Sequence, residues 1–204
     1  AADIPPPPSP DLPVHDALAY VKQVYAQIEP DGQDTWNPVA DDVEMWHRTR
    51  LLREACRLLR LHPKPVHTLR VLDVGCGVGR SARMLVDLGV QPGNLVAIDL
   101  RPAALATARA NNPAIDWRLV TGLDDWPDET FDLVVQCTVF SSLPGEELRR
   151  ATADRIRRAA GPNGHILWWD SHTANAFAGG DVLDPRPLFS DRKLLSCERL
   201  PMLP

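Results

Sequence analysis

The spacing of hydrophobic positions divides the chain at about residue 68. Before this point, apolar residues recur every three or four positions over 16–28 and again over 43–61, with the turn-rich EPDGQDTWNP between them. That period is typical of amphipathic helices. We therefore expect two helices in the N-terminal third of the chain.

Beyond residue 68, short apolar runs alternate with longer helical patterns. The runs occupy 69–74, 95–100, 115–120, 131–136 and 165–170, and the helical patterns occupy 79–88, 102–111 and 145–160. Near-continuous apolar runs separated by helices are typical of a parallel sheet that is covered on both faces. The sequence predicts an α/β fold, doubly wound, with a mostly parallel Rossmann-like sheet.

The two ends of the chain carry weaker patterns. Residues 1–15 are rich in proline, which favours an extended, mobile leader over packed structure. Residues 184–189, DPRPLF, predict a short helix or turn, and residues 192–200, RKLLSCERL, predict a sixth strand. We expect three parts: the leader at 1–15, a helical extension at 16–66 and the α/β domain at 67–204.

Composition narrows the class of ligand. The 204 residues carry a formal net charge of −5, whereas proteins that bind the nucleic-acid backbone need a basic surface. The arginines at 149, 150, 155, 157 and 158 alternate with apolar residues, as on a solvated helix face. We therefore expect no nucleic-acid partner.

Composition also bears on the compartment. No apolar run approaches the ~18 residues of a membrane span, and no signal peptide is recognisable. The four cysteines lack the spacing of metal ligands. We expect a cytoplasmic protein with no membrane partner and no metal.

A glycine-rich turn follows the first apolar run of the domain. In DVGCGVG, the glycines at 75, 77 and 79 allow a tight turn and a close approach of the backbone to a ligand. The next helix directs its free N–H groups to the same place. The dinucleotide fingerprint G-x-G-x-x-G would require glycine at Arg80. Asp73, an anion two residues before the turn, also suits an ammonium group better than a pyrophosphate.

A second acid ends the next apolar run. Asp99 closes LVAID, where a carboxylate can accept hydrogen bonds from both hydroxyls of a ribose. Together with Asp73, it predicts a nucleoside ligand that carries an ammonium group. A nicotinamide-dependent oxidoreductase is the weaker alternative, because Arg80 and Asp73 both disfavour a dinucleotide.

These motifs and their order resemble the class I S-adenosylmethionine-dependent methyltransferases. VLDVGCGVGR is similar to the first motif of that family and AIDL to its second. TGLDDWPDETFDLVV is similar to its adenine-contact region and fourth strand, and RRAAGPNGHILWWD to its helix, turn and fifth strand. The likeness covers about residues 68–170. It implies S-adenosyl-L-methionine as cofactor, S-adenosyl-L-homocysteine as product and a helical lid over the cofactor.

The resemblance also implies a set of cofactor contacts. Leu123 stands where many relatives have aspartate, so a side-chain contact to the adenine amine falls to Asp124 or is missing. The implied residues are Asp73, Gly75, Cys76, Gly77 and Gln136 around the methionine half, Asp99 at the ribose, and Leu100, Gly122, Leu123 and Asp124 at the adenine.

A narrower likeness concerns the acceptor. The region from QCTVFSS to WWDSHTANAF is similar to a bacterial subgroup of polysaccharide and secondary-metabolite methyltransferases, which implies a small-molecule acceptor, methylated on oxygen. The lack of an NPPY-like sequence disfavours methylation of nucleobase or glutamine nitrogen. The family's terminal pair of antiparallel strands is not recognisable in full, so we expect its last strand to be absent or incomplete.

Four residues are candidates for the acceptor side. His172 follows the fifth predicted strand and is our first choice as general base, because histidine titrates near neutrality. Asp170 is the second choice, although it can equally cap the strand end. Tyr25 and Trp36 lie in the helical extension and can line an acceptor pocket. Since a loop histidine is often structural, a cofactor-binding regulatory protein without transferase activity stays open as the alternative.

Overall fold

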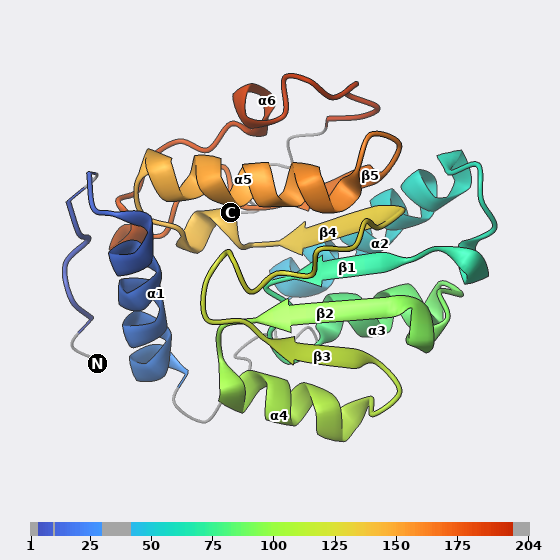
Figure 1. The fold of residues 1–204 in the computed structure, drawn as a ribbon, viewed down its shortest axis with the longest axis horizontal. Helices are drawn as coiled ribbons and strands as arrows, with labels where there is room; N and C mark the ends of the chain where they lie inside the picture. The colour runs from blue at the N-terminus through green and yellow to red at the C-terminus, as the bar shows by residue number, and fades with distance from the viewer. Residues whose placement is uncertain (1–3, 10, 30–41, 198–204) are drawn as a thin grey trace.

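The computed structural model describes residues 4–9, 11–29 and 42–197 and contains a five-stranded sheet in the order β3-β2-β1-β4-β5 (Figure 1). The strands are β1 (Val71–Val74), β2 (Leu95–Asp99), β3 (Asp116–Leu119), β4 (Leu133–Cys137) and β5 (His165–Trp169). Every pairing is parallel, and β1 lies between β2 and β4. The α/β fold with a parallel sheet that the sequence predicted is confirmed.

Helices cover both faces of the sheet. Residues of α2 (Asp42–Leu61), α3 (Arg80–Asp87) and α4 (Pro102–Asn111) form the core on one face. Residues of α1 (Val14–Ile28) and α5 (Glu146–Ala160) join the core on the other face. Alternate residues of β1 serve the two layers, which is why such a strand is apolar almost throughout.

The strand order reverses between β1 and β4. The chain runs outward from β1 through β2 to β3, and then returns to β4 on the other side of β1. Doubly wound sheets bind ligands at this point, outside the carboxyl ends of the strands. In Figure 1 the strand arrows point toward α1, which stands across this edge of the sheet. The fold therefore places α1 beside the expected ligand site.

The helices and strands predicted within residues 14–170 agree with the structure to within two residues at each end. The predicted short helix is also present, as α6 (Pro185–Leu188). The sixth strand is wrong over its described part, because residue 192 lies in a bend and residues 193–197 have no regular secondary structure. Arg192 donates to the carbonyls of Arg157 and Gly161, so side-chain bonds to the end of α5 hold this segment where sheet pairing was expected.

The prediction that the α5 arginines are solvated is wrong for Arg149. Its side chain is buried, and its guanidinium donates to the carbonyls of Leu143 and Ala178 and pairs with Asp181. A buried guanidinium requires such partners, because burying an unpaired charge is costly. Arg149 therefore links α5 to the segment that follows β5.

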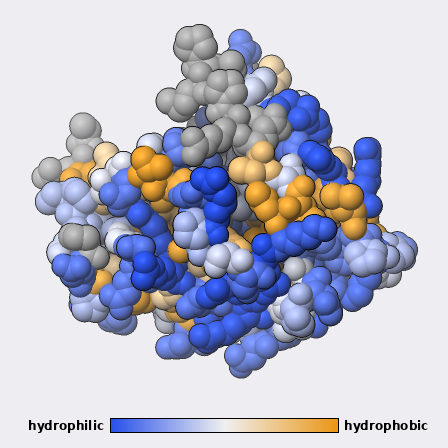
Figure 2. Space-filling model, turned by 90° about the horizontal axis from the view of Figure 1, so that it is seen from above, coloured by the Kyte–Doolittle hydropathy of each residue, from blue (hydrophilic) through white to orange (hydrophobic). Residues whose placement is uncertain are grey.

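Polar residues dominate one face of the molecule. On the face shown in Figure 2, hydrophilic residues cover most of the area and the apolar ones form separate groups. Among the described residues, no helix is both long and apolar enough to cross a membrane. Nor does the described part of the chain contain a group of three or more histidine, cysteine or acidic side chains placed to hold a metal ion.

Candidate functional site

A cavity of about 130 Å³ lies at the carboxyl edge of the sheet, at the point where the strand order reverses. Its wall combines the ends of β1, β2 and β4 with side chains of α1, α5 and the loop after β3. Six of the residues singled out from the sequence line it: Tyr25, Gly75, Asp99, Leu100, Gly122 and Leu123.

The glycine-rich turn forms one side of this cavity. Gly75 and Gly77 have φ angles of 65° and 55°, in the left-handed region that other residues avoid. A Cβ on Gly75 would lie 2.5 Å from Cγ2 of Val139, and a Cβ on Gly77 would lie 2.9 Å from Nη2 of Arg101. Glycine is therefore required for backbone shape and for space, and two side chains already lie against the turn.

Asp73 is fully buried at the end of β1. The Ser81 hydroxyl donates to its Oδ2 at 2.6 Å, whereas its Oδ1 has no hydrogen-bond partner. Burial, with a contribution from the charge of Asp99, raises the pKa of Asp73 to about 7. A buried polar atom without a partner destabilises the fold. The ammonium group of a ligand would supply the missing donor.

Gln136 lies on the neighbouring strand, paired in register with Val74. It is fully buried; its Oε1 accepts a hydrogen bond from the Val139 N–H at 3.1 Å, and its Nε2 has no partner. An unpartnered acceptor at the end of β1 and an unpartnered donor at the end of β4 match the ammonium and carboxylate groups of an amino acid. These atoms fit the methionine half of S-adenosyl-L-methionine.

Asp99 ends β2 beside the glycine-rich turn and is buried. Its Oδ2 accepts from the Gly77 N–H at 2.7 Å. Its Oδ1 accepts from both the backbone N–H and the Nε of Arg101, at 2.8 and 3.1 Å. The carboxylate thus lies where the sequence placed a ribose acceptor, and donors of the protein itself already bind it.

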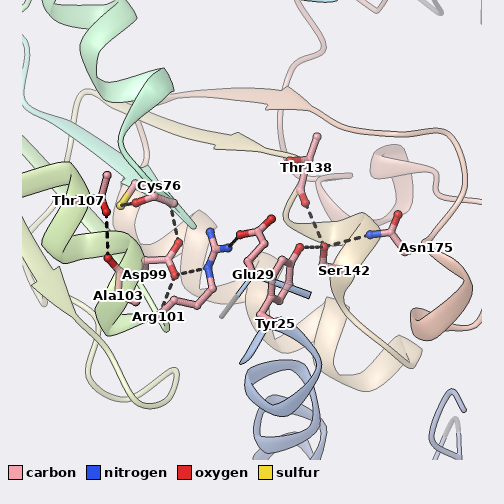
Figure 3. Close-up of polar contacts among 11 residues, drawn as sticks. Tyr25, Glu29, Cys76, Asp99, Arg101, Ala103, Thr107, Thr138, Ser142 and Asn175 are labelled. Atoms are coloured by element: carbon pink, nitrogen blue, oxygen red, sulfur yellow. Dashed lines mark hydrogen bonds and ion pairs between the residues drawn. The ribbon is translucent and has the colours of Figure 1, made fainter. Parts of the chain in front are cut away.

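Two contacts tie α1 to loops on opposite sides of the cavity. Lys22 donates from Nζ to the carbonyl of Thr121, in the loop after β3, at 2.7 Å. The Tyr25 hydroxyl shares a 2.7 Å hydrogen bond with Ser142, after β4 (Figure 3). The helix therefore closes the side of the cavity that faces away from the sheet.

A third contact joins the end of α1 to the loop after β2. Glu29, just beyond α1, forms an ion pair with Arg101, and the guanidinium of Arg101 lies 4.6 Å from the centre of the Tyr25 ring. Figure 3 shows these side chains in one line from Asp99 to Ser142. Burial raises the pKa of Tyr25, so its hydroxyl stays protonated near neutral pH and can donate a hydrogen bond.

Five of the predicted cofactor contacts are not among the residues that line the cavity: Asp73, Cys76, Gly77, Gln136 and Asp124. Asp124 is exposed and does not line the cavity, although its neighbours Gly122 and Leu123 do. The Cys76 side chain is buried, and burial raises the pKa of its thiol well above the ordinary value. The backbone N–H of Cys76 donates to the carbonyl of Ile98, which fixes the turn against β2.

The predicted catalytic pair lies apart from the cavity wall. The Asp170 carboxylate accepts from the backbone N–H groups of Phe140, Ser141 and Ser171, at 2.8, 3.2 and 2.9 Å. His172 is exposed, and neither His172 nor Asp170 lines the cavity. The predicted acceptor residue Trp36 lies outside the described residues.

Sequence reasoning missed several polar residues of the cavity wall, among them Arg101, Thr138, Ser142 and Thr152. Thr138 has a φ of 58°, which is rare for a β-branched residue and typical of functional sites. A signal existed for Thr138 and Ser142, because residues that follow β4 meet the same sheet edge as Asp73. No signal marked Thr152, whose buried Oγ1 on α5 has no hydrogen-bond partner.

Comparisons with known proteins agree with this geometry. Residues 71–164 match the family described as "Methyltransferase domain". A malonyl-[acyl-carrier protein] O-methyltransferase of Halorhodospira halophila is 34% identical over 122 residues, which are 56% of this chain and 39% of that protein. A ubiquinone biosynthesis O-methyltransferase of Rhizobium etli is 30% identical over 101 residues, 48% of this chain and 41% of that protein. The chain thus spans about two fifths of the length of these relatives.

Solved structures share the fold. The N-methyltransferase NodS of Bradyrhizobium japonicum, in complex with S-adenosyl-L-homocysteine, superposes with a TM-score of 0.56 at 23% identity, over 70% of each chain. A DhpI complex with the same ligand superposes with a TM-score of 0.51 at 22% identity, over 75% of this chain and 66% of that one. Residues 71–164 therefore match a methyltransferase domain, and the chain shares the fold of these two methyltransferase structures, as the sequence motifs predicted.

Proposed function

We propose that the protein transfers a methyl group from S-adenosyl-L-methionine to an oxygen atom of a small-molecule acceptor. The observation that carries this proposal is the pair of unpartnered buried atoms, Asp73 Oδ1 and Gln136 Nε2, at the ends of adjacent strands. They suit the amino-acid half of the cofactor, and Asp99, on the next strand, suits its ribose. The match to the methyltransferase domain supports the same reading.

The adenine would lie against the loop after β3. Leu100, Gly122 and Leu123 line that end of the cavity, and Trp126 adds a buried aromatic surface. An apolar wall with few polar groups is typical of small-molecule sites. Because Asp124 is exposed, we propose that backbone groups of this loop contact the adenine amine.

The acceptor would bind on the side of Tyr25. Hydroxyl groups of Tyr25, Thr138, Ser142 and Thr152 belong to cavity-lining residues, among apolar neighbours from α1. They offer hydrogen bonds to an acceptor that carries a hydroxyl or carboxyl group. The names of the two curated relatives, both O-methyltransferases, support oxygen as the methylated atom. A secondary-metabolite or saccharide pathway stays a proposal from the sequence likeness.

The protein's main contribution to the rate would be alignment. When bound, the cofactor supplies a methyl group on a positively charged sulfur, which is already a good leaving group. Holding the acceptor oxygen in line with that methyl can be worth about 7–11 kcal/mol of the barrier. Tyr25 and Ser142 are placed to orient the acceptor, because their hydroxyls meet at the cavity wall.

Titration calorimetry with S-adenosyl-L-homocysteine tests this function. We expect the wild type to bind and Asp99→Ala to bind about 10–100-fold more weakly, since hydrogen bonds to a charged acceptor contribute about 1.5–3 kcal/mol each. Asp128→Ala, which removes an exposed carboxylate outside the cavity wall, is the matched control and should bind like the wild type. No binding by the wild type, or undiminished binding by Asp99→Ala, would contradict the proposal.

A second measurement separates the enzyme from a cofactor-binding regulator. Release of S-adenosyl-L-homocysteine is followed while a panel of small hydroxylated and carboxylated acceptors is added to the protein and S-adenosyl-L-methionine. Acceptor-dependent release is expected. Tight cofactor binding with no acceptor-dependent release across the panel would favour the regulatory alternative.

A further inference from the structure

The guanidinium of Arg101 lies in the part of the cavity that a ribose would need. Its Nε donates to Asp99 Oδ1 at 3.1 Å, and its Nη2 lies close enough to Gly77 to be 2.9 Å from a Cβ added there. Arg101 therefore lies against both the carboxylate and the glycine-rich turn. Figure 3 shows the side chain reaching from the loop after β2 toward Asp99 on one side and Glu29 on the other.

The hydrogen-bond capacity of Asp99 shows that the ribose and Arg101 compete. Each carboxylate oxygen has two lone pairs. Oδ1 already accepts two bonds, from the backbone N–H and the Nε of Arg101, and Oδ2 accepts one from Gly77. A ribose diol that donates to both oxygens needs one free lone pair on each oxygen. The Nε bond is the one that can be given up by a side-chain rotation, because the other two donors are backbone groups.

Arg101 also connects this carboxylate to α1. It forms the ion pair with Glu29 just beyond α1, and it lies over the ring of Tyr25, which the helix carries. The other side-chain hydrogen bonds that anchor the helix, from Tyr20, Lys22 and Tyr25, reach segments that do not include Asp99. Arg101 is thus the contact through which an event at Asp99 reaches the helix.

The cavity is small for the ligand that it is proposed to hold. Its 130 Å³ compares with roughly 300–1,000 Å³ for typical ligand pockets. Side chains that lie over the glycine-rich turn, Arg101 and Val139, account for part of the missing space. Movement of Arg101 would enlarge the cavity at the ribose position.

We propose that Arg101 occupies the ribose position of the cofactor site and is exchanged for the ribose hydroxyls when the cofactor binds. The exchange breaks the link between Asp99 and the Glu29 end of α1, so the closed cavity opens in response to the adenosyl group. This inference rests on the proposed function, because it takes an adenosyl cofactor as the ligand.

Affinity measurements with two nucleosides test the exchange. Arg101→Met should bind S-adenosyl-L-homocysteine and adenosine about tenfold more tightly than the wild type, because no Asp99 bond has to be displaced. The gain should be absent for 2′,3′-dideoxyadenosine, which lacks the hydroxyls that compete for Asp99. Arg118→Met, at a partly exposed arginine outside the cavity wall, is the matched control and should show no gain.

The outcomes separate the two proposals. Failure of the wild type to bind S-adenosyl-L-homocysteine would overturn the proposed function itself. Wild-type binding together with equal or weaker binding by Arg101→Met would overturn only the exchange, as would an equal gain for adenosine and its dideoxy analogue. If Arg101→Met does not fold because the ion pair between Arg101 and Glu29 is lost, the double variant Glu29→Gln/Arg101→Met removes both charges of that pair and should show the same gain.

Discussion

Asp73 is a buried carboxylate and Asp170 a partly buried one, both near the carboxyl ends of strands, yet their surroundings differ. Asp73 lies in β1 and has one oxygen without a hydrogen-bond partner, whereas Asp170 follows β5 and accepts three backbone N–H bonds. Burial raises the pKa of both groups. A raised pKa alone therefore does not distinguish the proposed ligand-binding acid, Asp73, from Asp170. The feature that separates the two acids is Asp73 Oδ1, which has no hydrogen-bond partner.

The partners of Asp170 indicate a structural role. Phe140 and Ser141 begin a short 3₁₀ helix after β4, and their N–H groups have no partner within that helix. Asp170 caps those groups from the neighbouring strand. The contrast predicts that substitution of Asp170 lowers the free energy of unfolding, whereas substitution of Asp73 weakens binding of the cofactor.

The largest effect on stability is expected from Asp170→Ala. Loss of the carboxylate leaves the Phe140 and Ser141 N–H groups without their acceptor, and each buried unsatisfied donor costs about 1–3 kcal/mol. Urea unfolding should show a free energy of unfolding lower by about 2–4 kcal/mol, with Asp170→Asn, which keeps an acceptor oxygen, less affected. A folded Asp170→Ala protein of wild-type stability that had lost transferase activity would instead identify Asp170 as a catalytic group.

Asp73→Asn, unlike Asp170→Ala, should weaken cofactor binding and leave the free energy of unfolding nearly unchanged. Removing the charge that a ligand ammonium would meet is expected to weaken binding of S-adenosyl-L-homocysteine about 10–100-fold. The free energy of unfolding should change little, because the amide still accepts from Ser81 and no longer buries a charge. Parallel calorimetry and urea unfolding check both parts. A large loss of stability with unchanged affinity would make Asp73 a cap of α3 only.

The raised pKa of Asp73 adds a pH dependence to the same comparison. With a pKa of about 7, the carboxyl group of the free protein is mostly protonated at pH 6 and mostly ionised at pH 8. A ligand ammonium binds the ionised form, so affinity for S-adenosyl-L-homocysteine should rise about tenfold from pH 6 to pH 8. Asp73→Asn should abolish most of this rise. A flat profile in the wild type would show that the ammonium does not meet Asp73.

In the unliganded protein, the folding stability that Asp73 contributes falls as the pH rises, in the opposite direction to the cofactor affinity. Because the folded state holds the Asp73 proton to higher pH than the unfolded chain does, folding stability from this group is lost as the pH rises from about 4 to 7. Urea unfolding at pH 5 and pH 8 checks this, with Asp73→Asn as the reference that lacks the group. The cofactor should therefore stabilise the protein more at pH 8 than at pH 6.

The comparison also explains which parts of the site were predictable from sequence. Asp73 and Asp99 lie near strand ends. The alternation of side chains along the strand, the burial of the strand and the glycine or helix that follows it fix the position of a side chain there. The same reasoning predicted all five strands and which of them carry the acidic residues of the site. It did not find the bond of Arg101 to Asp99, because the bonds of that side chain also involve Glu29, 72 residues away in sequence.

The acceptor side was less predictable for a physical reason. Its wall is made from α1, the loop after β4 and α5, which are far apart in sequence and meet only in the folded chain. A histidine or aspartate near a strand end is equally compatible with a cap, a base or an exposed position. Arg149 shows the same limit. Its place in the helical pattern predicted a solvent-exposed side chain, whereas the segment after β5 packs over it and buries it.

The smallest effect is expected at His172. The side chain is exposed and lies outside the cavity wall, so His172→Ala should change the turnover number by less than about threefold and leave cofactor affinity unchanged. Removing a general base typically costs a hundredfold or more in rate. A loss of that size, with normal affinity for S-adenosyl-L-homocysteine and a missing acidic limb in the pH–rate profile, would establish the histidine as the base that the sequence predicted and would require the loop after β5 to move toward the cavity.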